Sequence, residues 1–239
     1  MAVAVLALGV AGLAVALVGL AFQLLPRQFT AQQQRQITDW EIGKRWRAMP
    51  AGTIFPPSLQ YAAPASVSDD PALRLSASRI GIARQATCAA ATDSAVATVL
   101  TGQRCEAMLR ATYADGTDSY VVTVGVAVLP GSAQVAIAER ALARVTGGDG
   151  KGVHAVPVAG TPAAAFTDSR RQLSGSMAAG PYLVFYTIGY ADDRPRVPVV
   201  ADSYADAEMM AAGQGVARAV ASVLGKPVPP PHCPGTPGC

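Results

Sequence analysis

The chain has 239 residues, of which 51% are hydrophobic and 15% charged, and its formal net charge is +3. The surplus of three basic side chains lies in residues 27–50, because residues 51–239 hold 14 basic and 14 acidic side chains. A protein that binds nucleic acid normally presents a basic face to the phosphates, so this balance argues against a nucleic-acid partner.

Residues 1–26 are predicted to form a transmembrane anchor. The run from Ala2 to Phe22 has no charged or polar side chain, and about 20 helical residues cross a hydrocarbon layer of ~30 Å. The run lacks a basic start, and it ends in QLLPR rather than in a small-residue cleavage site, which favours an uncleaved anchor over a secretory signal. A buried soluble helix is the alternative, but this run would present no polar face to water.

Residues 27–75 are predicted to be a juxtamembrane helix followed by a proline-rich linker. Both tryptophans of the chain, Trp40 and Trp46, lie in the helical part. Their rings suit the headgroup layer of a membrane, and they equally suit a connecting helix that packs on its own domain. Five prolines between positions 50 and 71 then indicate a loose connection.

A globular domain is expected over residues 76–226, with its first strand at 73–84 entering near Ala72. An alanine-rich stretch predicts a helix over 85–100, and Asp115-Gly116 between two alternating runs predicts a hairpin. The expected strands of this first half are 105–113 and 119–129, and the helix that follows is 132–145. A loop, GGDGKG, occupies 147–152.

The second half of the domain is predicted to contain further strands and one long helix. The expected strands are 153–158, 163–166, 170–177 and 182–190, the last two joined by Gly180-Pro181, and the helix is 203–224. Hairpins separated by helices predict an α+β fold, an antiparallel sheet with hairpins packed against helices, preceded by one transmembrane helix. Residues 227–239 form a Pro/Gly/Cys tail.

The densest apolar segment of the domain is 182–190, which is apolar on both faces and is therefore predicted to be a central strand. If one of its faces were exposed, Tyr182, Tyr186 and Tyr190 would form a possible partner-binding surface.

Four cysteines, Cys88, Cys105, Cys233 and Cys239, include no C-x-x-C pair and are accompanied by only two histidines, so a metal site is not indicated. Of the three possible connectivities, Cys88 with Cys105 and Cys233 with Cys239 is favoured. A continuous helix from Cys88 to Leu100 would carry the chain about 18 Å, which leaves too few residues for the return unless the helix is shorter. Disulfides indicate an oxidising compartment, whereas the basic residues after the anchor favour a cytoplasmic domain. We give the cysteines more weight and expect an extracytoplasmic domain. The basic cluster would then contact anionic lipid headgroups, or the true start of the chain would lie upstream and carry basic residues of its own.

No catalytic set is recognised. The chain lacks a G-x-S-x-G elbow, and a histidine mechanism would depend on His154 alone, in a predicted strand where a structural histidine is the commoner case. The acidic pairs, among them Asp115 with Asp118 and Asp202 with Asp206, are interpreted as turn and cap residues, with weak calcium binding as the alternative. No cofactor or metal is expected. An anchored hydrolase that uses His154 or Ser174 remains the alternative.

The apolar anchor, WEIGKRWRAMPAGTIFPP, the Cys88–Cys105 segment leading into LRATYADG, GPYLVFYTIGYADDRPR and the closing CPGTPGC together resemble anchored extracytoplasmic proteins of high-GC Gram-positive bacteria. At the level of the fold, the resemblance is to small α+β sensor and lipoprotein domains. It implies a location outside the membrane and transfers no functional residues. The sequence thus predicts a single-pass, non-enzymatic binding or accessory protein of the cell envelope, whose partners are the membrane and an envelope or secretion-related protein, with a small ligand as the alternative to the protein partner.

Overall fold

The computed structural model describes residues 30–145, 151–197 and 204–226. The predicted anchor and the tail with Cys233 and Cys239 lie outside these residues. Residues 39–227 form one compact unit, which contains the sheet and the cavities. In the described part of the chain, no helix combines the length and apolar character that a bilayer crossing requires.

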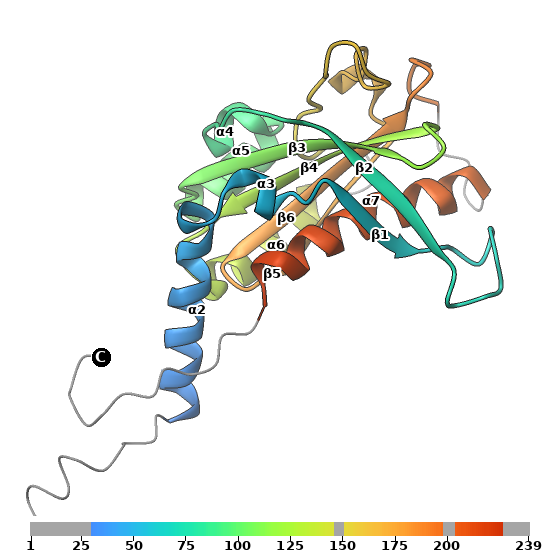
Figure 1. Cartoon of the computed structure of the whole chain (residues 1–239). Helices are drawn as coiled ribbons and strands as arrows, with labels where there is room; N and C mark the ends of the chain where they lie inside the picture. The colour runs from blue at the N-terminus through green and yellow to red at the C-terminus, as the bar shows by residue number, and fades with distance from the viewer. Residues whose placement is uncertain (1–29, 146–150, 198–203, 227–239) are drawn as a thin grey trace, which may run out of the picture. The chain divides into compact units, whose positions relative to one another are not determined.

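The core of this unit is a six-stranded antiparallel sheet with the strand order β1-β2-β3-β4-β6-β5 (Figure 1). The α+β prediction is therefore confirmed for the described residues. The strands are β1 Ser58–Ala62, β2 Arg74–Ile82, β3 Ala107–Asp115, β4 Tyr120–Val128, β5 Leu173–Ala179 and β6 Tyr182–Tyr190. The helices are α2 Ala31–Ala48, α3 Ala51–Ile54, α4 Cys88–Ala91, α5 Ser94–Gly102, α6 Ser132–Val145 and α7 Tyr204–Leu224, with a 3-10 turn η1 at Asp168–Arg170.

Helices cover both faces of the sheet. The long helix α7 packs on one face, against β1, β4, β5 and β6 (Figure 1). On the other face, α4, α5 and α6 close a hydrophobic core over one half of β3, β4 and β6, around Leu100, Met108 and Phe185. The other half of that face is covered by the segment 151–171, where Phe166 and Ala163 pack on Val121.

The strand β6 occupies the position that its two apolar faces predict. It lies between β4 and β5 and is buried from Tyr182 to Gly189, and its ends agree with the predicted range 182–190. Gly180, with φ +62°, makes the predicted hairpin to β5. Glycine is the residue that tolerates this left-handed conformation without steric cost.

The β3–β4 hairpin forms as predicted, but the residue with a left-handed backbone is not the glycine of the Asp-Gly pair. The left-handed residue is Asp118, with φ +52°. Gly116 is needed for space, because a Cβ there would lie 2.7 Å from the hydroxyl of Ser76 on β2.

The edge strand β1 was not predicted. Residues 58–62 lie within the expected linker, yet they pair with β2 in register from Ser58↔Ser78 to Ala62↔Arg74. Leu59 and Tyr61 alternate inward between exposed neighbours, and five residues between prolines are too few to show this alternation convincingly in the sequence.

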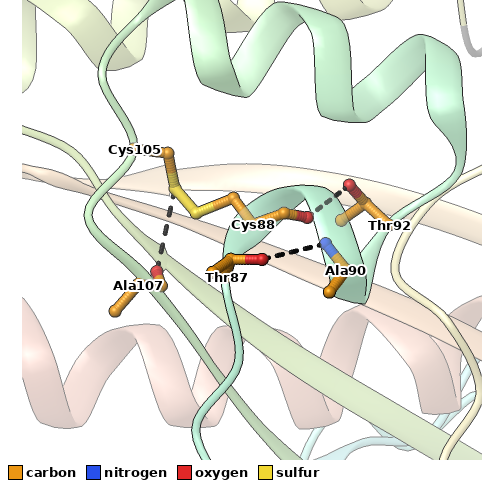
Figure 2. Close-up of a disulfide and its surroundings, with 6 residues drawn as sticks. All are labelled: Thr87, Cys88, Ala90, Thr92, Cys105 and Ala107. Carbon is orange, nitrogen blue, oxygen red and sulfur yellow. Dashed lines mark hydrogen bonds between the residues drawn. A yellow bond between two sulfur atoms is a disulfide. The ribbon is translucent and has the colours of Figure 1, made fainter.

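The helix predicted over 85–100 is wrong as a single element. It is divided into α4 and α5 at Thr92 and Asp93, whose backbones are extended. The Thr92 hydroxyl donates to the carbonyl of Cys88 at 2.8 Å and so closes α4 (Figure 2). The break shortens the path back to Cys105, as the geometry of the pair required.

The predicted Cys88–Cys105 disulfide is confirmed, with the two Cα atoms 6.2 Å apart (Figure 2). Cys88, the first residue of α4, is buried in the hydrophobic core, so the bridge joins α4 to the entry of β3. The pairing of Cys233 with Cys239 lies outside the described residues.

The strands predicted at 153–158 and 163–166 are wrong, because this segment crosses the sheet as a loop. Two sheet threonines hold it: Thr112 donates to the carbonyl of Val156 at 2.8 Å, and Val156 N–H donates to Thr123 at 3.0 Å. The backbone groups of Val156 are therefore satisfied by side chains and not by a strand ladder.

Candidate functional site

A cavity of about 450 Å³ opens between the β3–β4 hairpin, strands β1 and β2, and the first half of α7. Its size falls within the range of small-molecule sites in proteins. Its lining mixes aromatic, acidic and hydroxyl side chains: Tyr61, Val67, Arg74, Leu75, Ser76, Asp115, Gly116, Thr117, Ser119, Tyr120 and Glu208.

Asp115 ends β3 at the floor of this cavity and is 8% exposed. Its carboxylate accepts hydrogen bonds from the backbone N–H groups of Tyr120 at 2.7 Å and of Thr117 at 3.1 Å, and from the Thr117 hydroxyl. The interpretation of Asp115 as a turn residue therefore holds for its hydrogen bonds. The same bonds hold the Asp115 carboxylate in a fixed position at the cavity wall.

Glu208 adds a second carboxylate from α7. It accepts a hydrogen bond from the Tyr120 hydroxyl at 3.2 Å. Burial, followed by the charges of Asp115 and Glu208, raises the pKa of Tyr61 to about 12. Burial and Glu208 likewise raise the pKa of Tyr120. Both tyrosines are thus neutral hydrogen-bonding groups in a negative surrounding.

Two glycines let α7 lie close enough to the sheet to form this wall. A Cβ at Gly213 would lie 2.6 Å from the ring of Tyr186, and one at Gly215 would collide with Tyr61. Gly213 and Gly215 of the GQG stretch therefore allow α7 to pack directly on β1 and β6. Tyr61 lies between α7 and the cavity.

A second cavity, of about 470 Å³, continues along α7 from the first. The two share Tyr61 and Arg74, and the second is also lined by Gln214, Gly215 and Arg218 from the helix. We call the two cavities together the α7 groove. It follows one side of the helix beside the edge strand β1.

A polar cluster lies on the opposite face of the sheet, beside the start of α5. Arg171 forms a two-pronged ion pair with Asp93, with N···O distances of 2.7 and 2.9 Å. Burial opposes ionisation of the Asp93 carboxyl, but hydrogen bonds from Arg171 and from Gly152 N–H outweigh it and lower its pKa. This pair links α5 to the loop that precedes β5.

His154 joins the same cluster through Asp168, whose Oδ2 lies 2.5 Å from His154 Nδ1. Asp168 also accepts from Ala155 N–H at 2.8 Å and contacts Arg171. The histidine therefore has an acidic neighbour. Neither His154 nor Ser174 lines the α7 groove; Ser174 shares a hydrogen bond with Thr187 at 2.9 Å.

The three tyrosines considered as a partner surface lie in different surroundings. Tyr182 is fully buried, and its hydroxyl donates to the carbonyl of Ile42 on α2. Tyr186 is 6% exposed, between Gly175 and Gly213. The exposed face on which that surface depended is thus absent at these two positions, because α2 and α7 cover them. Tyr190 is half-buried at the end of β6, with its ring 5.6 Å from that of Tyr120.

The sequence did not indicate that the residues lining the α7 groove lie close together in space. Tyr61 comes from an unpredicted strand, and Glu208 lies on a helix far along the chain. The signal that could have drawn attention to them is the pair of glycines in α7, which marks a close helix–sheet contact. In the described ranges, no three His, Cys, Asp or Glu side chains are grouped as metal ligands.

No protein-family model, curated protein or solved structure matches this chain.

Proposed function

We propose that this protein is a single-pass, membrane-anchored binding or accessory protein of the cell envelope, whose folded domain lies outside the cytoplasmic membrane and binds its partner in the α7 groove. The groove is the observation that carries the proposal. It is concave, it combines aromatic with polar side chains, and it is built by a rigid helix packed on a sheet, as binding sites commonly are.

The location is supported by the Cys88–Cys105 disulfide, because such bonds persist in oxidising compartments. The apolar run at 2–22 supplies the anchor in this proposal. The basic residues that follow it would then face lipid headgroups. The exposure of Trp40 on α2, 59%, with Lys44 over its ring, supports such a contact.

A photocrosslinking amino acid at Arg218 tests the groove. Arg218 is an exposed residue of α7 that lines the second cavity. The matched control is Arg140, an exposed arginine of α6 on the other side of the sheet. We expect a discrete covalent adduct in cells from position 218 and none from position 140; identical patterns from both positions would contradict binding in the groove.

A membrane-anchored hydrolase remains a second candidate because of the His154–Asp168 pair, which has the contact that a general base needs from an orienting carboxylate. Replacement of His154 by Gln tests it. Screening for ester and amide hydrolysis should show activity that depends on His154 if this candidate is correct, and none if the binding function is.

A further inference from the structure

The first cavity of the α7 groove carries an indication of what it binds. We propose that it takes the positively charged nitrogen of an organic amine, held between the carboxylates of Asp115 and Glu208 and the ring of Tyr120. This inference rests on the proposed function, since it names the ligand chemistry of the same groove.

The two carboxylates of the cavity wall accept hydrogen bonds from neutral groups. Within the described residues, no Lys or Arg forms an ion pair with Asp115 or Glu208; their partners are Thr117 and the hairpin N–H groups for the first, and the Tyr120 hydroxyl for the second. The one basic residue of the lining, Arg74, is exposed and donates to the carbonyls of Pro71 and Leu73 in its own turn. Burial is the largest cause of the raised pKa of Tyr61, and the charges of Asp115 and Glu208 add to it.

Beside the cavity, the side chain of Arg194, which is paired with Asp192, lies over an aromatic ring. The guanidinium of Arg194 lies over the ring of Tyr190, 4.1 Å from its centroid, and Tyr190 contacts Tyr120. Tyr190 of this pair thus has a positive group over its ring, while Tyr120 lines the cavity. An ammonium group there would gain both the attraction of the carboxylates and a cation–π contact.

An amine fits this set of groups better than a metal ion does. Calcium takes six to eight oxygen ligands, whereas the cavity offers two carboxylates, one of which is already engaged by three donors of its hairpin. An ammonium group needs few acceptors and benefits from a ring. The volume of about 450 Å³ also exceeds what a single ion needs.

The charge can be tested without any mutation by comparing choline with 3,3-dimethylbutan-1-ol, which has the same shape and no charge. Binding to the full chain in detergent is measured by ligand-detected NMR titration. We expect choline to bind about tenfold more tightly than the alcohol. Equal affinities, or no binding of choline, would overturn the inference.

The site is tested by Glu208→Gln, which removes the charge and keeps an oxygen that can accept from Tyr120. The matched control is Glu139→Gln on α6, whose side chain is also half-buried. Choline affinity should fall about fivefold in the first variant and stay unchanged in the second. An unchanged affinity in Glu208→Gln would place the amine elsewhere and overturn the proposal.

The same chemistry can come from a free amine or from a lysine side chain of a protein partner. Nα-acetyl-lysine methylamide, titrated beside choline, distinguishes these sources, because tighter binding of the lysine derivative indicates a protein. Crosslinking from Arg218 is independent of the ligand's charge. A positive crosslink with no preference for choline would therefore refute the amine and leave the groove in place.

Discussion

Reduction of the Cys88–Cys105 bridge should lower the free energy of unfolding by about 3 kcal/mol. The two cysteines are 17 positions apart, and the loop-entropy relation assigns about this value to a loop of such length. The experiment uses a chain that carries Cys233→Ser and Cys239→Ser, so that only this pair responds. Reduction breaks the cross-link but leaves both side chains in place, so the measured loss of stability reflects the cross-link and not the packing of Cys88.

Urea unfolding followed by far-ultraviolet circular dichroism, with and without reductant, measures the change. With a slope of about 2 kcal/mol per molar urea, the midpoint should fall by about 1.5 M. The double variant Cys88→Ala and Cys105→Ala should lose at least as much, because it also removes buried volume. A loss below about 1 kcal/mol on reduction would refute the loop argument.

Three other features of the domain give predictions that stability measurements or titrations can check. Gly215→Ala should destabilise the protein by about 1–2 kcal/mol, because overpacking against Tyr61 outweighs the gain in helix propensity, whereas Gly102→Ala, which meets open space, should not; equal effects in chemical denaturation would contradict this. Asp93→Asn should cost about 2–3 kcal/mol near pH 7, because the buried Arg171 loses its two-pronged carboxylate partner and keeps the longer contact with Asp168, at 3.4 Å. Because the pKa of Asp93 is lowered by folding, its contribution is present above about pH 4 and is lost as the pH falls through the folded value, so the variant should show a flatter acid limb of the stability curve. Finally, Tyr61 has a raised pKa of about 12, so stability should decline as the pH rises from about 10 towards 12, and Tyr61→Phe should remove one late-ionising phenol from the absorbance titration at 295 nm.

The sequence predicted best those elements whose own pattern decides their structure. The strand at 182–190 is apolar on both faces, and the helix at 132–145 has an amphipathic period, so each was assigned without knowledge of its neighbours. The spacing of Cys88 and Cys105 even required a shorter helix than the alanines suggest, and the break at Thr92 supplies it.

The elements that were missed depend on partners far along the chain. Residues 58–62 become a strand because β2 offers an edge and α7 covers Tyr61. The segment 153–158 has the composition of a strand, but Thr112 and Thr123 hold it as a loop. The groove could not be predicted for the same reason, since Tyr61, Asp115 and Glu208 meet only after the sheet and α7 have packed.

The most direct test of the proposed location is protease accessibility on intact cells from which the wall has been removed. We predict that added protease degrades the domain while a cytoplasmic marker protein stays intact, because the proposed location puts the disulfide-bonded domain outside the membrane. Protection of the domain until the cells are lysed, with Cys88 and Cys105 recovered as free thiols, would contradict this account.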